Sequence, residues 1–176
     1  MVGMDTTDID TMAEWDGIEC VASLEACNGV TKCRGVIFAP PDKCSINSFS
    51  FTLRLKRGNG VGFLPIIGAW HREHTRVHDI LHRGELQEIL NKDFTEYTYD
   101  VPPENEVCAD AENPVVLGFY TEECASHRSS SAEIGQVKGH TTPFIPSSVY
   151  LNGKFTTGTW KTYEGTLACR IRYTKL

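Results

Sequence analysis

The chain has 176 residues, of which 40% are hydrophobic and 10% aromatic, so it can bury a core and is not a disordered tail. This length fits one domain, and no apolar run approaches the roughly 20 residues that cross a membrane as a helix. Lys and Arg number 17 against 23 Asp and Glu, and the net charge of −6 argues against a nucleic-acid-binding protein, whose surface must attract phosphates.

The first 30 residues are predicted to be an extension with a short helix, and residues 31–176 to be the folded domain. Residues 1–12 carry three aspartates, no basic residue and no apolar run, so they resemble neither a secretory signal nor a transit peptide. Two locations stay open: the cytoplasm, or secretion after removal of a leader.

Hydrophobic residues at every second position dominate the pattern and predict β-strands, whose side chains alternate between two faces. Residues 48–55 show it most clearly, with Phe49, Phe51, Leu53 and Leu55 on the face that is expected to be buried. Further strands are predicted at residues 36–38, 61–70, 95–101, 115–121, 149–151 and 166–173.

Glycine, proline and asparagine separate these segments, which is typical of β-sandwiches. The predicted fold is therefore all-β, a single β-sandwich of the jelly-roll type. Residues 123–140 hold several serines and few bulky apolar residues, and they are predicted to be a long mobile loop.

Seven cysteines make the chain cysteine-rich, and their spacing fits no paired zinc motif. Cys169 is expected to be a free thiol, because it lies on the apolar side of the alternating residues 166–173. The other six could form up to three disulfides in an oxidising compartment, and both redox states stay open. Their positions are Cys20, Cys27, Cys33, Cys44, Cys108 and Cys124.

Scattered aromatic and strand positions give the chain a family resemblance. The segments are VIFAPPDKCSINSFSFTLRL, FLPIIGAW, FTEYTYDV, PVVLGFYT, VYLNGKF and WKTYEGTLACRIRY, and the resemblance covers roughly residues 34–173. In this order they resemble secreted bacterial β-sandwich domains that precede C-terminal sorting signals and are compared with carbohydrate-binding jelly rolls. The resemblance implies a sandwich and brings no catalytic residues. The sorting segment is missing here, and the many cysteines depart from the pattern.

Four histidines, His71, His74, His78 and His82, fall within twelve residues. If residues 71–83 are helical, all four share one arc, and the pairs four residues apart can place two imidazoles on one metal ion such as Zn²⁺. The alternatives are a solvated polar connection without a ligand and a patch that responds to pH near 6.

Sugar-binding sites use exposed aromatic rings with amide or carboxylate partners. Trp160 lies in a polar setting and is predicted to be an exposed stacking residue together with Tyr163, while Asn152 or Glu164 would bond the hydroxyl groups. Trp70 ends an apolar run and is expected in the core.

No pattern indicates an enzyme: the Cys124–His127 pair is interpreted as a disulfide or an exposed thiol, and no GxSxG motif occurs. The leading hypothesis is a non-enzymatic binding module with a glycan or protein ligand, carbohydrate first. The alternatives are a transition-metal-binding protein or metalloenzyme that uses the four histidines, and a self-assembling structural protein with an exposed sheet edge. The oligomeric state stays open.

Overall fold

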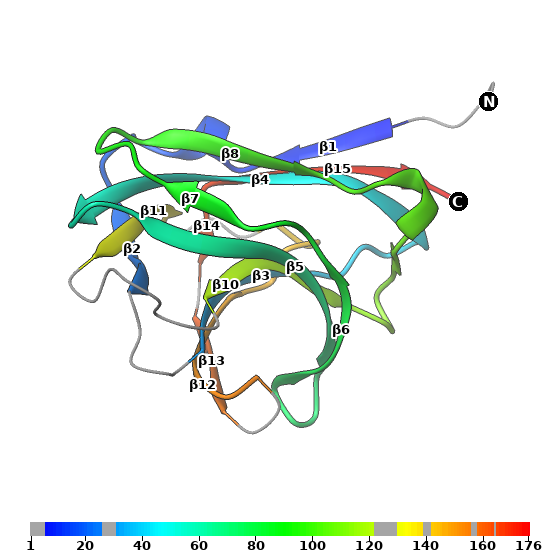
Figure 1. Ribbon diagram of the computed structural model, residues 1–176. Coiled ribbons are helices and arrows are strands. Elements are labelled where there is room, and N and C mark those ends of the chain that lie inside the picture. The colour runs from blue at the N-terminus through cyan, green and yellow to red at the C-terminus, as the bar shows by residue number, and fades with distance from the viewer. Residues whose placement is uncertain (1–5, 26–30, 122–129, 139–141, 156–157, 164) are drawn as a thin grey trace.

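A computed structural model places two antiparallel β-sheets face to face (Figure 1). It describes residues 6–25, 31–121, 130–138, 142–155, 158–163 and 165–176. The all-β sandwich predicted from the sequence is confirmed, while its jelly-roll connectivity stays a prediction. Within the described ranges, no helix has the length and apolarity needed to cross a membrane.

The larger sheet is built around β4, the longest strand of the described chain. Its path is β1 (Thr6–Asp10), β15 (Cys169–Lys175), β4 (Cys44–Arg57), β11 (Ser131–Val137) and β14 (Thr166–Leu167). Three more strands join it: β2 (Cys20–Glu25) pairs with β11, and β8 (Thr95–Asp100) and β9 (Cys108–Ala109) pair with β4.

The smaller sheet has two hairpins at its ends. Its path is β13 (Thr159–Tyr163), β12 (Ser148–Gly153), β3 (Thr31–Phe38), β10 (Val115–Thr121), β5 (Val61–His71) and β6 (Arg76–Arg83), and β7 (Gln87–Ile89) pairs with β5. Two short 3₁₀ helices, η1 (Met12–Glu14) and η2 (Pro103–Asn105), complete the described elements.

The main core lies between the sheets. The alternating residues of β4 point into it as predicted, and Phe49, Phe51, Leu53 and Leu55 are all buried. Aromatic rings join the two layers, since the ring of Phe119 on β10 lies 5.3 Å from that of Phe51 on β4 in an edge-on arrangement.

A second core lies on the other face of the smaller sheet. This sheet curls, and Figure 1 shows the β5–β6 and β12–β13 hairpins bending toward each other. The curl brings Trp70 on β5 to Trp160 on β13, with ring centroids 6.1 Å apart. Tyr120, Val149 and Leu151 fill the space around them. The prediction that Trp70 belongs to a core is confirmed.

The first 30 residues, set apart as an extension in the sequence analysis, contribute strands to the larger sheet. β1 pairs with β15 and β2 with β11, and η1 lies between β1 and β2. The remaining residues of this stretch, 1–5 and 26–30, lie outside the described ranges.

The prediction of one long loop at residues 123–140 is wrong for its central part. Ser131–Val137 form β11, which has β4 on one side and β2 on the other. Its small and polar residues give little strand signal, but flanking strands supply the partners, and Ala132 and Ile134 enter the main core. Residues 123–129, 139 and 140 lie outside the described part of the chain.

Candidate functional site

Two of the predicted ligand residues, Tyr163 and Asn152, share one face of the smaller sheet. Tyr163 pairs with Ser148, Tyr150 with both Lys161 and Arg34, and Asn152 with Lys32. Residues directly opposite each other, and residues two apart on one strand, point to the same face. We call this face the tyrosine surface: Lys32, Arg34, Tyr150, Asn152, Lys161 and Tyr163.

Arg34 holds the two rings of the tyrosine surface in place. Its guanidinium carbon lies 4.6 Å from the ring centroid of Tyr150 and 5.6 Å from that of Tyr163, which is the range of cation–π attraction. Burial lowers the pKa of Arg34 from its ordinary value. Lys32 donates a hydrogen bond of 3.4 Å to the Tyr150 hydroxyl. Tyr163 keeps 40% of its surface exposed, so part of its ring is open to a ligand.

Arg34 and Lys32 were not predicted as site residues, because they join the site only through the long-range pairing of β3 with β12. No local sequence pattern predicts the pairing of β3 with β12. The alternation of side chains along residues 148–153 does predict that Tyr150 and Asn152 lie on one face of their strand.

The prediction of Trp160 as an exposed stacking residue is wrong. Only 6% of its surface is exposed, and its ring contacts Trp70 and Phe155, the latter at 5.3 Å between centroids. Trp160 lies opposite Leu151 and so points to the second core, away from Tyr163. The polar neighbours of Trp160 in the sequence suggested exposure, but the curl of the smaller sheet brings Trp70 against its ring and buries it. Glu164 lies outside the described residues.

Residues 71–83 do not form the helix on which the metal-site hypothesis was conditional. His71 ends β5, residues 72–75 form the turn, and β6 returns antiparallel to β5. Two register shifts in this pairing leave His78 and Leu81 as extra residues on β6. Such β-bulges redirect the side chains that they carry and are frequent beside functional sites.

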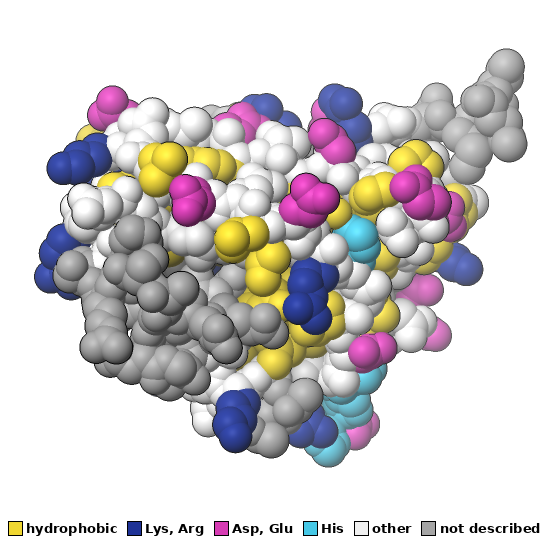
Figure 2. All heavy atoms as spheres, viewed as in Figure 1, with side chains coloured by type: hydrophobic (Ala, Val, Ile, Leu, Met, Phe, Trp, Pro, Cys, Tyr) yellow, Lys and Arg dark blue, Asp and Glu magenta, His cyan; other side chains and the backbone are white. Residues whose placement is uncertain are grey.

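Three of the four predicted metal ligands gather at the turn of this hairpin. The ring of His71 lies 4.3 Å from that of His74 and 5.6 Å from that of His78. Figure 2 shows histidine side chains together at the lower right, beside acidic ones. His82 is separate, because its ring stacks on Tyr99 of β8. We call His71, His74 and His78 the histidine cluster.

Two hollows border the histidine cluster. A groove of about 550 Å³ lies between the hairpin and the segment after β9, and its lining includes Trp70, His71, His78 and Glu112. A cleft of about 400 Å³ lies between the hairpin turn and the start of β13, where His74 and Trp160 line the same space. Ligand sites are commonly concave and of this size.

In the part of the chain that the structure describes, no three His, Cys, Asp or Glu side chains are arranged to hold a metal ion. The zinc site predicted from His71, His74, His78 and His82 required a helix that would place all four on one face. Instead, His82 lies farther along β6 and stacks on Tyr99, away from the other three. Transition-metal binding therefore stays a prediction without support from this geometry.

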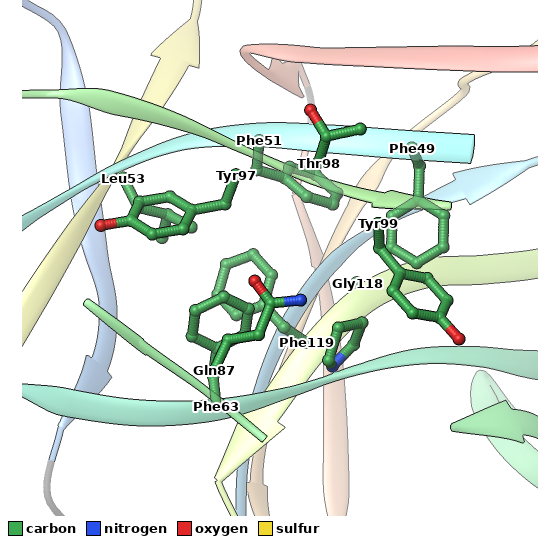
Figure 3. Close-up of a pocket in the computed structure, with 11 residues that line it drawn as sticks. Phe49, Phe51, Leu53, Phe63, Gln87, Tyr97, Thr98, Tyr99, Gly118 and Phe119 are labelled. Carbon is green, nitrogen blue, oxygen red and sulfur yellow. The ribbon is translucent and has the colours of Figure 1, made fainter. Parts of the chain in front are cut away.

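Aromatic side chains also line a gap between the two sheets. Figure 3 shows Tyr97 and Tyr99 on one side of it, Phe63 and Gln87 on the other, and Phe119 between them. The cavity measures only about 10 Å³, roughly one water molecule, so these rings serve packing and not the binding of a ligand.

Each cysteine that the structure describes is a free thiol: Cys20, Cys33, Cys44, Cys108 and Cys169. The prediction for Cys169 is confirmed, since its side chain is fully buried and burial raises the pKa of its thiol to about 12. Cys27, Cys124 and His127 lie outside the described residues, so their predicted chemistry stays a prediction.

Comparison with known proteins adds no relative. No family model, no curated protein and no solved structure matches the chain.

Proposed function

We propose that this protein is a non-enzymatic carbohydrate-binding module and that the sugar lies on the tyrosine surface. The observation that carries the proposal is that the guanidinium of Arg34 lies within cation–π distance of both Tyr150 and Tyr163, the three residues coming from three neighbouring strands. A guanidinium that attracts both rings restrains their orientation, which reduces the entropy that a ligand must overcome.

The chemistry of this face suits a pyranose. The exposed part of the Tyr163 ring offers an apolar platform for the C–H face of a sugar. Asn152 and Lys161 are exposed on the same face and can exchange hydrogen bonds with the hydroxyl groups. Ligand-binding sites commonly combine aromatic surface with a few precisely placed hydrogen-bonding groups.

The test is a glycan panel followed by calorimetric titration of any sugar that binds. Tyr163→Ala removes the platform and is expected to weaken binding about tenfold or more, the equivalent of about 1.4 kcal/mol. Tyr163→Phe keeps the ring and is expected to retain most of the affinity. Lys161→Ala is expected to weaken binding, whereas Lys175→Ala, an exposed lysine on the larger sheet, is the matched control.

Thermal denaturation of each variant shows whether it is folded. The proposal fails if the folded protein binds no sugar of the panel, or if Tyr163→Ala binds with unchanged affinity.

A further inference from the structure

The tyrosine surface is positively charged, although the chain as a whole is acidic. Three of its six residues, Lys32, Arg34 and Lys161, are basic and none is acidic, whereas the chain has 17 Lys and Arg against 23 Asp and Glu. A positive face on an acidic protein attracts negatively charged ligands to that face.

Strand pairing sets the charged residues in rows across β13, β12 and β3, which are neighbours in the smaller sheet (Figure 1). Lys161, Tyr150 and Arg34 form the middle row, because Tyr150 pairs with both of the others. Tyr163 lies in the row on one side of it and Lys32 in the row on the other side. Such rows are roughly 7 Å apart, twice the rise per residue of a strand. A ligand that stacks on Tyr163 and follows the strands therefore reaches Lys161 and Arg34 next.

Two of the three cations are held against one aromatic ring. The guanidinium carbon of Arg34 lies 4.6 Å from the ring centroid of Tyr150, and Nζ of Lys32 lies 6.0 Å from it. The hydrogen bond from Lys32 to the Tyr150 hydroxyl restrains the lysine further. Like charges in such an arrangement repel each other, so an anion placed beside them is attracted by both.

The two lysines are not neutralised by carboxylates. In the part of the chain that the structure describes, no Asp or Glu lies within ion-pair distance of Lys32 or Lys161. Arg172 on the larger sheet differs, since its Nε lies 3.0 Å from Oδ1 of Asp8. The lysine charges of the tyrosine surface are therefore left for a ligand.

Protection of a sheet edge does not account for these charges. A lysine on an edge strand prevents pairing with another chain, and this role suits Lys161, because β13 ends the path of the smaller sheet. Lys32 and Arg34 lie instead on β3, which pairs with β12 on one side and with β10 on the other. Both are partly buried there, where a positive charge is costly unless it serves recognition.

We propose that the sugar bound by the tyrosine surface is anionic: an oligosaccharide in which the unit beside the one stacked on Tyr163 carries a carboxylate or a sulfate group. This inference rests on the proposed carbohydrate-binding function and names the class of sugar. Both groups present negatively charged oxygens, which accept strong charge-assisted hydrogen bonds from lysine and arginine. Lys161 and Arg34 lie in the row where that group is placed.

The experiment compares sugars that differ in charge. Calorimetric titration uses two pairs of ligands: oligogalacturonate with its methyl ester, and dextran sulfate with dextran. We expect the charged member of at least one pair to bind at least about tenfold more tightly than the neutral member. A preference within the first pair assigns a carboxylate and a preference within the second assigns a sulfate. Raising the salt concentration from about 0.05 M to about 0.5 M should weaken the preferred interaction, because salt screens it.

The double variant Lys32→Gln, Lys161→Gln removes two charges and keeps hydrogen-bonding side chains of similar length. It is expected to lower the affinity for the preferred anionic sugar about tenfold and to narrow the difference within the pair. Lys175→Gln, at an exposed lysine of the larger sheet, is the matched control and should bind as the unmodified protein does. Thermal denaturation shows whether each variant is folded. Polyglutamate, a charged chain without sugar rings, should bind more weakly than the anionic sugar.

The outcomes separate this inference from the proposed function. If charged and neutral sugars bind equally and Tyr163→Ala weakens both, the anionic class is wrong and the carbohydrate site stands. If no sugar binds, both are wrong. Full affinity for the anionic sugar in the folded double variant, or equally tight binding of polyglutamate, would also overturn the inference.

Discussion

Nε2 of His82 and the hydroxyl of Tyr99 are hydrogen-bonded, and their rings stack at an angle of 27°. His82 lies on β6 of the smaller sheet and Tyr99 on β8 of the larger one, so this contact closes the sandwich along one side. The ring of Tyr99 lies so close to Gly84 that a Cβ there would come within 2.6 Å of it. The two sheets are therefore joined at their margins as well as through the core.

Removing this hydroxyl should cost stability without disturbing the ring. Tyr99→Phe is expected to lower the free energy of unfolding by about 0.5–1.5 kcal/mol, because one hydrogen bond is lost while the packing stays. Urea denaturation measures the change. Tyr163→Phe, on the exposed tyrosine surface, is the control and should be nearly neutral. If Tyr99→Phe is as stable as the unmodified protein, the hydrogen bond between His82 and Tyr99 contributes nothing to the free energy of unfolding.

The pairing of Gly35 with Gly118 predicts a severe effect of a single methyl group. A Cβ on Gly35 would lie 2.9 Å from Cα of Gly118 and 2.5 Å from the carbonyl oxygen of Leu117, both in the backbone of β10. Gly35→Ala must push the strands apart and is expected to lower the free energy of unfolding by about 1–3 kcal/mol.

Gly62→Ala is the control for this substitution, since its Cβ would meet the end of the Leu86 side chain at 3.4 Å and the carbonyl oxygen of Gln87 at 3.8 Å, which are ordinary contact distances. Urea denaturation of both variants gives the comparison. Equal effects would show that the close approach of β3 and β10 is relaxed at little cost.

The buried thiol of Cys169 makes stability depend on pH in the alkaline range. Its pKa is raised by burial from 9.0 to about 12. The unfolded chain therefore releases this proton at a lower pH than the folded one. Stability is complete below about pH 9 and declines as the pH rises toward about 12.

Denaturation at about pH 8 and about pH 10.5 should show this decline. In Cys169→Ala the decline should be less steep, although the variant is less stable at both pH values because it leaves a small void. The same slope in both proteins would place the titration at another group.

The turn between β5 and β6 offers a stabilising substitution, because Thr75 has a φ of 45° there. Glycine adopts positive φ without steric cost, so Thr75→Gly is expected to raise the free energy of unfolding by about 1 kcal/mol. Thermal denaturation measures the gain. Thr98→Gly, in the middle of β8, is the control and should be destabilising, because glycine weakens an ordinary strand. A loss of stability in Thr75→Gly would show that the threonine side chain contributes more than its strain costs.

Apolar runs and apolar residues at every second position predicted several strands of this fold, because each of these strands has at least one face in a core. Val115–Thr121 matches β10 from end to end, and residues 48–55 lie within β4. The sequence pattern did not predict strands whose burial depends on pairing with strands far away in the sequence. Ser131–Val137 has weak strand propensity and forms β11 because β4 and β2 enclose it.

Pairing between strands also decides where the predicted site residues lie. Spacing alone fits His71, His74 and His78 to a helix, and only the pairing of β6 with β5 shows that they meet across a turn. Trp160 has polar neighbours in sequence and an aromatic one, Trp70, in space. Tyr163 and Asn152 share a face as expected of a common site, because β12 and β13 are adjacent along the chain.

All seven residues of β10 are buried, because the main core lies on one face and the second core on the other. β15, in contrast, alternates between buried and exposed positions over most of its length. A complete mutational scan should therefore find every second position of β15 permissive and no permissive position along β10. Evolution faces the same constraint, so β10 should be the slowest segment to diverge and the best anchor for recognising remote relatives of this chain.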